Sequence, residues 1–223
     1  MQKKPKVYIL ENVVGLVRIN GGVYFKAVLE ALGTAGDYNI YHRIMDTKDH
    51  GIPHSRPRVY IVGILSSLDD GSFEFPDKIR SAPIGMFLDK AARRSSHANL
   101  PNATATTAVK NVTAALRELT AQGKNPLRKP YVIDCDSTVG RSQYMLGICP
   151  CITCRRGQGH WLTHKGRRMN KQEMLRLQGM DPSKFKAGRS AVRVRKGAAG
   201  GSDRSPELGS EAWRALVPPP LPP

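Results

Sequence analysis

Short apolar runs separated by polar turns dominate the first 65 residues. Residues 7–10 form a continuous apolar run, which predicts a strand buried on both faces. Residues 38–45 and 59–64 predict two further strands, the last strongly apolar. Between the first two strands, helical spacing links Phe25, Val28, Leu29 and Leu32, and Gly33 or Gly36 can end that helix. This order predicts an α/β unit with a largely buried sheet.

The pattern weakens from Ser66 to about Lys165. Within this stretch, apolar positions predict a helix over residues 108–122 and a strand over 131–134, which suits a small, loop-rich second lobe. Residues 170–178 predict a short helix, because Asn170 is a favourable N-cap and Glu173 can reach back to the cap amide. From Ala187 the chain is rich in Gly, Ser, Arg, Ala and Pro, which predicts a disordered tail.

The chain is strongly basic. It has 223 residues, enough for one sizeable domain, and a formal net charge of +17. Subtracting the tail from Lys186 onward leaves +13 on residues 1–185. Such a surface fits a polyanionic partner, although a basic protein without one is the alternative. No apolar run approaches the ~20 residues that span a bilayer, and no secretory signal follows the basic N-terminus. We therefore expect an intracellular protein without a membrane partner.

The four cysteines are Cys135, Cys149, Cys151 and Cys154. In an intracellular chain, free thiols or metal ligands are more common than disulfides. The last three, with His160 and His164 nearby, resemble a zinc cluster, but their spacing fits none of the usual paired patterns. We expect no metal site, and a zinc-binding interaction module remains an alternative.

Two motifs carry candidate chemistry. Glu11-Asn12-Val13 ends the first apolar run, and Gly51-Ile52-Pro53-His54-Ser55-Arg56-Pro57-Arg58 precedes the third predicted strand. A carboxyl group can exchange a proton with a ring nitrogen, while a guanidinium can hold a carbonyl oxygen or a phosphate. Arg56 and Arg58 point to the same side of an extended segment, because they are two residues apart. Solvated charges at strand ends are the alternative for all three residues.

With these motifs in place, residues 7–185 resemble the C-terminal part of the DNA (cytosine-5)-methyltransferase family. Two further stretches support the resemblance: Pro150-Cys151-Ile152-Thr153 and Met174-Leu175-Arg176-Leu177-Gln178-Gly179-Met180. It implies a partial Rossmann-like sheet of the kind found in S-adenosylmethionine-dependent methyltransferases, with a target-recognition lobe. In the implied chemistry, a cysteine thiolate attacks C6 of a flipped cytosine in DNA, and C5 takes the methyl group of S-adenosylmethionine.

The resemblance also assigns roles to single residues. Glu11 matches the glutamate that contacts N3 of the cytosine and assists its protonation, which relieves electron density pushed onto the ring. Arg58 matches the arginine that holds the cytosine O2, and Arg56 matches the one that supports DNA or catalytic-loop contacts. The family's motif is Gln-x-Arg-x-Arg, and in this chain His54 stands in place of the glutamine.

Residues 66–168 correspond in position to the target-recognition region. DNA is the implied partner, and no obligate protein partner is implied. Basic and polar residues of this region and of the second motif are candidate DNA contacts, to phosphates or to guanine edges, and a solvated basic face is the alternative. The candidates are His54, Ser55, Arg141, Arg155, Arg156, Lys165, Arg167 and Arg168.

Three family features are missing from this sequence. It has no glycine-rich cofactor loop after a strand, no Pro-Cys-Gln nucleophile loop before Glu11, and no late Gln-x-Gly-Asn motif. Cys151 follows a proline but lies downstream, so we do not expect it to be the nucleophile. We therefore expect no cofactor-binding residues in a fragment truncated at both ends, which is inactive alone. A non-catalytic nucleic-acid-binding remnant is the alternative.

These expectations give a division of the chain. Residues 1–65 would be the C-terminal half of the catalytic α/β domain, and 66–168 the target-recognition region. Residues 169–185 would be a helix that returns to the catalytic domain, and 186–223 a low-complexity tail. If the protein is eukaryotic, its substrate implies the nucleus.

Overall fold

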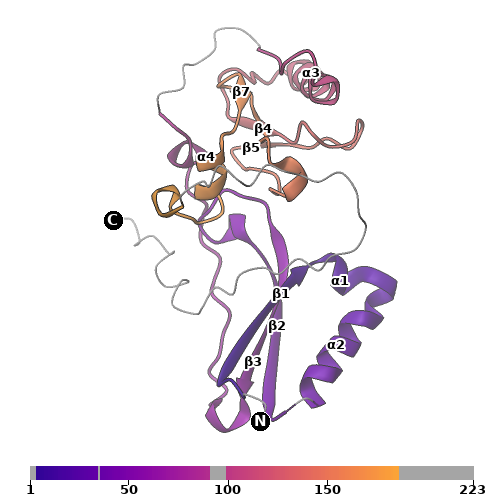
Figure 1. Ribbon diagram of the computed structural model, residues 1–223, viewed down its shortest axis with the longest axis vertical. Coiled ribbons are helices and arrows are strands. Elements are labelled where there is room, and N and C mark those ends of the chain that lie inside the picture. The colour runs from indigo at the N-terminus through magenta and orange to yellow at the C-terminus, as the bar shows by residue number, and fades with distance from the viewer. Residues whose placement is uncertain (1–3, 35, 91–98, 186–223) are drawn as a thin grey trace.

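The computed structural model describes residues 4–34, 36–90 and 99–185, which form two lobes, each built on its own sheet (Figure 1). The predicted tail, 186–223, lies outside the described residues.

The first lobe contains three strands and two helices. The strands are β1 (Val7–Val13), β2 (Tyr38–Asp46) and β3 (Pro57–Leu65), and the helices are α1 (Gly15–Arg18) and α2 (Val23–Thr34). The predicted strand–helix–strand–strand order is confirmed. The sheet has the order β1-β3-β2, and both pairings are antiparallel, unlike the parallel strands of a complete Rossmann sheet.

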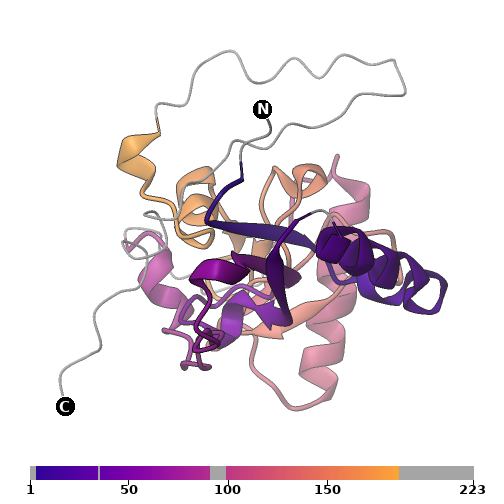
Figure 2. The same cartoon turned by 90° about the horizontal axis from the view of Figure 1, so that it is seen from below.

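Helix α2 covers one face of this sheet (Figures 1 and 2). Its Phe25 is buried with Val59 and Ile61 of the central strand β3. Val28, Leu29 and Leu32 pack against the same cluster, as their helical spacing predicts. The apolar face of α2 therefore fixes β3, the strand that also carries the arginine motif.

Strand β1 departs from its predicted burial. Val7, Ile9, Leu10 and Val13 are between 42% and 52% exposed, so the prediction of a strand buried on both faces is wrong for β1. The reason is that β1 is an edge strand, with a neighbouring strand, β3, on one side only. Central β3 is the buried strand, with Val59 at 0% and Ile61 at 3% exposure.

The second lobe is a four-stranded antiparallel sheet with one long helix. Its strands are β4 (Tyr131–Ile133), β5 (Tyr144–Leu146), β6 (Trp161–Leu162) and β7 (Arg167–Arg168), in the order β5-β4-β6-β7. Helix α3 (Thr106–Ala121) matches the predicted helix and packs Ala108, Val112 and Ala115 on Ile133 and Trp161. Among the described residues, no helix is both long and apolar enough to cross a bilayer.

The short helix α4 (Lys171–Arg176) has the predicted capping box. The Asn170 side chain accepts from the amide of Glu173 at 2.9 Å, and Glu173 accepts from the amide of Asn170 at 2.8 Å. Met174 and Leu177 are buried in a cluster with Val132 and Leu162 of the second sheet, and Ile52, from the segment before β3, packs against the same cluster. The return of residues 169–185 to the catalytic domain stays a prediction.

Candidate functional site

The strand register brings the two sequence motifs together. In the β1–β3 pairing, Glu11 lies opposite Tyr60 and Val13 opposite Arg58, so the acid and the arginine share one face of the sheet. Glu11 Oε1 is 3.1 Å from Arg56 Nη2 and 3.3 Å from Arg58 Nε. The predicted convergence of one carboxylate and two guanidinium groups is confirmed.

Arg58 is the least exposed member of this group, and Glu11 is the most exposed. The Glu11 side chain is 39% exposed, whereas the Arg58 side chain is 13% exposed. The 3.1 Å hydrogen bond from Arg56 and the 3.3 Å approach of Arg58 both fall on Oε1. A planar ring with a nitrogen and an adjacent carbonyl could therefore approach the partly exposed carboxylate while the arginines supply N–H donors.

Asp46, at the end of β2, holds the segment that carries the arginines. Its carboxylate accepts from the Arg56 amide at 2.7 Å and from the Ser55 hydroxyl at 3.4 Å, and it pairs with Lys48. Burial raises the pKa of Asp46, but hydrogen bonds from Lys48 and from the Arg56 amide outweigh it and leave the pKa below its ordinary value. The sequence analysis missed Asp46. The sequence held one signal for it, because Asp46, like Glu11, is an acid near the end of a predicted strand.

His54 is fully buried, so the prediction that it contacts DNA is wrong for this conformation. Its Nε2 accepts from the Ile152 amide at 3.1 Å. Burial, followed by the charge of Arg56, lowers its pKa to about 4, and the ring is neutral at ordinary pH. Ser55, another predicted DNA contact, is half-buried and donates its amide to the Cys149 carbonyl at 2.8 Å.

A thiol lies beside the arginine pair. The sequence did not predict this position of the thiol. Cys151 Sγ is 3.9 Å from Arg58 Nη2, although the two residues are 93 positions apart. The Cys151 side chain is half-buried. The segment around Cys151 therefore contributes to the surroundings of Arg58 from the second lobe.

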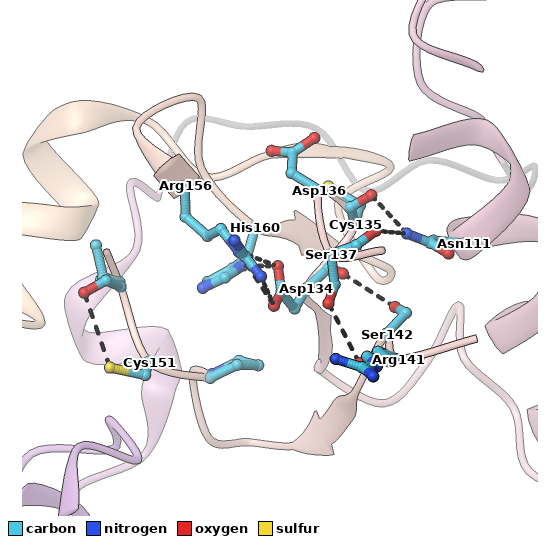
Figure 3. A network of polar contacts seen from close by, with 12 residues as sticks. Asn111, Asp134, Cys135, Asp136, Ser137, Arg141, Ser142, Cys151, Arg156 and His160 are labelled. Carbon is cyan, nitrogen blue, oxygen red and sulfur yellow. Dashed lines mark hydrogen bonds and ion pairs between the residues drawn. The ribbon is translucent and has the colours of Figure 1, made fainter. Parts of the chain in front are cut away.

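Three predicted DNA-contacting arginines are paired with carboxylates inside the second lobe. Arg156 binds Asp134 through Nε and Nη2 at 2.9 and 3.0 Å, and His160 Nδ1 lies 3.6 Å from the same carboxylate (Figure 3). In the same way Arg167 pairs with Glu173 at 2.7 Å, and Arg168 with Asp136 at 2.8 Å. These contacts brace the lobe, and a role in DNA binding stays a prediction.

The remaining candidates differ in how open they are. Arg141 and Arg155 are exposed, and Arg141 sits in the loop after β4, which Asn111 of α3 supports by donating to the carbonyls of Cys135 and Ser137 (Figure 3). Lys165 is half-buried and donates to the Asp89 carbonyl at 2.9 Å. Arg141 and Arg155 are thus the candidates best placed to meet a phosphate.

The cysteines and histidines of the zinc alternative do not gather into a site. In the part of the chain that the structure describes, no three His, Cys, Asp or Glu residues are close enough to share a metal ion. Burial raises the pKa of the Cys149 thiol and disfavours the thiolate that zinc needs. His160 is directed to Asp134 rather than to a thiol.

Comparison with known families decides the relationship. A family model described as C-5 cytosine-specific DNA methylase matches residues 1–199. The chain belongs to this family. The resemblance noted from the sequence motifs is therefore confirmed.

Two curated relatives illustrate the match. The chain is 31% identical to the type II methyltransferase M.HaeII of Haemophilus aegyptius, over 92% of this chain and 59% of that protein. It is 32% identical to M.NgoBI of Neisseria gonorrhoeae, over 96% of this chain and 61% of that protein. The chain thus spans about three fifths of the length of these relatives. Among solved structures, the S. pombe Dnmt2 methyltransferase aligns with a TM-score of 0.46 at 18% identity, over 86% of this chain and 59% of that one.

Methyltransferases of this family use S-adenosylmethionine, so we tested whether the described residues fit it. A shallow hollow of about 610 Å³ beside the site is lined by Asn12, Val13, Gly15, Leu16, Arg18 and Ile19. This lining is mostly apolar, and its one charged group is an arginine, so it offers no carboxylate to pair with the cofactor's sulfonium and ammonium charges. Gly21 and Gly22 lie between α1 and α2 rather than after a strand. The lining of this hollow therefore fits the cofactor's positive charges poorly.

Proposed function

We propose that this chain is the cytosine-holding and DNA-binding part of a DNA (cytosine-5)-methyltransferase. The observation that carries the proposal is the Glu11 carboxylate, which pairs with Arg56 and Arg58 while its side chain stays 39% exposed. Protonated, this group can donate to N3 of an extruded cytosine, and Arg58 can donate to the adjacent O2. Such donors relieve the negative charge that builds on the ring when a nucleophile adds to C6.

The second lobe would bind the duplex around the extruded base. Support for this role comes from the exposed Arg141 and Arg155 and from the net charge of +17. Contacts between such side chains and phosphates release counterions, so the affinity should fall steeply as salt rises. A gel-shift series at increasing salt measures this dependence.

We further propose that these 223 residues transfer little or no methyl group on their own. The proposal rests on the poor fit to the cofactor and on the missing Pro-Cys-Gln sequence. The test is a methyl-transfer assay with labelled S-adenosylmethionine on duplex DNA, in which we expect counts at background. Robust turnover by the purified chain would overturn this statement.

A binding experiment tests the base contact directly. Fluorescence anisotropy compares duplexes that carry cytosine or 3-deazacytosine opposite an abasic position, because the second base lacks the N3 acceptor. We expect the wild type to prefer cytosine by roughly tenfold, the worth of one charged hydrogen bond, and Glu11→Ala to lose the preference. Glu30→Ala, an exposed acid on α2, is the matched control.

Each outcome of that experiment points to one function. Equal affinity of the wild type for both duplexes would contradict the role of Glu11. If binding were then still salt-dependent, the alternative of a nucleic-acid-binding remnant without base recognition would take its place.

A further inference from the structure

Two segments almost a hundred residues apart are joined beside the proposed site. Residues 53–55, just before β3, form a parallel bridge with Cys149 of the second lobe. The Cys149 amide donates to the Pro53 carbonyl and the Ser55 amide donates to the Cys149 carbonyl, both at 2.8 Å. This bridge connects the two lobes through backbone atoms alone.

The His54 side chain adds a third bond to the bridge. Its Nε2 accepts from the amide of Ile152 at 3.1 Å, three residues beyond Cys149. His54 is 0% exposed and Ile152 9%, so water cannot readily replace this bond. A buried amide without an acceptor is costly, and the position therefore requires a side chain with an acceptor at this reach.

The residue between these contacts meets the arginine pair. Cys151 precedes the amide that His54 holds, and its Sγ lies 3.9 Å from Arg58 Nη2. Arg58 Nε in turn lies 3.3 Å from Glu11. Segment 149–152 thus contacts both ends of the arginine motif. His54, at the start of the motif, binds the Ile152 amide, and Arg58, at its end, packs against Cys151.

We propose that His54 is a positioning residue that clamps segment 149–152 against the arginine motif and thereby sets where Arg58 lies relative to Glu11. A glutamine has a carbonyl oxygen that can accept the same amide, so the replacement of glutamine by histidine in this motif preserves the clamp. The clamp itself is a statement about structure. Only its effect on cytosine binding rests on the function proposed above.

Thiol reactivity tests the clamp without any assay of function. The variants are His54→Leu, which fills the space without an acceptor, and His54→Gln, which restores one. Iodoacetamide alkylation of Cys151, followed by peptide mass spectrometry, should be about tenfold faster in His54→Leu and near the wild-type rate in His54→Gln. Exposed Cys154 is the internal reference.

The matched control is His50→Leu, four residues earlier. Its bridge to Ile79 uses backbone atoms, so Cys151 should keep the wild-type rate. An unchanged rate in folded His54→Leu, or an equal increase in His54→Gln, would overturn the proposal. If His54→Leu does not fold, hydrogen exchange of the Ile152 amide in the wild type and in His54→Gln decides, and rapid exchange in either folded protein overturns it.

Cytosine recognition separates this proposal from the proposed function. With the anisotropy assay above, His54→Leu should lose the preference for cytosine over 3-deazacytosine, and His54→Gln should keep it. A wild type without any preference refutes the proposed function but leaves the alkylation result to judge the clamp. A wild-type preference that survives intact in His54→Leu refutes the link from the clamp to Arg58.

Discussion

The acids of this protein differ in what surrounds them. The Glu11 side chain is 39% exposed and contacts two guanidinium groups, whereas Glu173 is 0% exposed and accepts from Arg167 and from two backbone amides. Asp46 is of the second kind, with its carboxylate enclosed by the segment that it holds. Open acids suit chemistry on a ligand, and enclosed acids hold the chain in place.

The enclosure of Asp46 leads to a stability prediction. In Asp46→Ala, the Arg56 amide and Lys48 lose their acceptor, so the free energy of unfolding should fall by about 2 kcal/mol in urea denaturation. Asp70→Ala is the control, because Asp70 bonds only within its own turn, to Ser72. Equal midpoints for the two variants would contradict the anchoring role.

His54 makes stability depend on pH in a defined window. Its pKa is about 4 in the folded protein and near 6.5 in the unfolded chain. Between these values the unfolded chain binds a proton that the folded protein does not, so acidification favours unfolding. From pH 6.5 to 4 we expect a loss of about 3 kcal/mol, measured by urea denaturation at stepped pH. In His54→Gln this part of the slope should disappear, and an unchanged slope would contradict the prediction.

At the residue scale, the sequence predicts which charged side chains lie near one another better than it predicts which side chains are buried. The two-residue spacing of Arg56 and Arg58 suffices to predict that they point to the same side of the segment. Their convergence with Glu11 was implied by the family resemblance, because strand geometry alone does not decide which strands pair. The burial of His54 depends on Ile152, 98 residues away, and no local pattern contains that contact. For the same reason Arg156 and Arg168 gave no sign of their carboxylate partners, which are 22 and 32 positions away.

At the scale of elements, β3 organises the first lobe because both neighbouring strands and α2 pack on it. Within β3, one glycine is in close contact with a tyrosine of the neighbouring strand. Tyr8 of β1 lies over Gly63, where an added Cβ would come within 2.1 Å of the tyrosine ring. A larger residue at position 63 would displace this ring from its place over β3.

Two glycine substitutions therefore have opposite predicted effects. Gly63→Ala should lower the free energy of unfolding by about 1–3 kcal/mol, because the Tyr8 ring must move away from β3 to admit the methyl group. Gly33→Ala, in α2 with no atom within 4 Å of the new Cβ, should raise it by about 0.5–1 kcal/mol. Thermal unfolding of both variants checks the signs, and destabilisation by Gly33→Ala or tolerance at Gly63 would refute this account.

The periodicity of apolar residues predicted the long helices and strands correctly but did not predict the short strands. Helices α2 and α3 and strands β2 and β3 are long enough to show a repeat, and their predicted positions are confirmed. Strands β6 and β7 have two residues each, which is less than one full alternation. Their residues are held by contacts distant in sequence, such as the packing of Trp161 on α3 and the pairing of Arg168 with Asp136.

At the scale of the whole molecule, the exposed edge strand β1 has a consequence for solubility. Its outer backbone groups pair with no described strand, and Val7, Ile9 and Val13 present apolar side chains on one face. Edge strands of this kind favour association between chains.

Ile9→Lys should reduce that association. The new charge lies on the exposed face of β1, 52% exposed in the wild type, so the fold should be kept. Static light scattering at increasing concentration should show less aggregate than in the wild type, and Ile9→Val should behave as the wild type does. Equal scattering from all three proteins would mean that β1 does not cause the association between chains.

The bridge between residues 53–55 and Cys149 also bears on how the chain is made. On the ribosome, Glu11, Arg56 and Arg58 emerge long before Ile152, whose amide lies 98 positions beyond His54. At about 5–20 residues per second, the sheet of the first lobe has several seconds to assemble before its brace exists. The geometry around the carboxylate is therefore completed late in synthesis, when the second lobe closes onto a strand that is already in place.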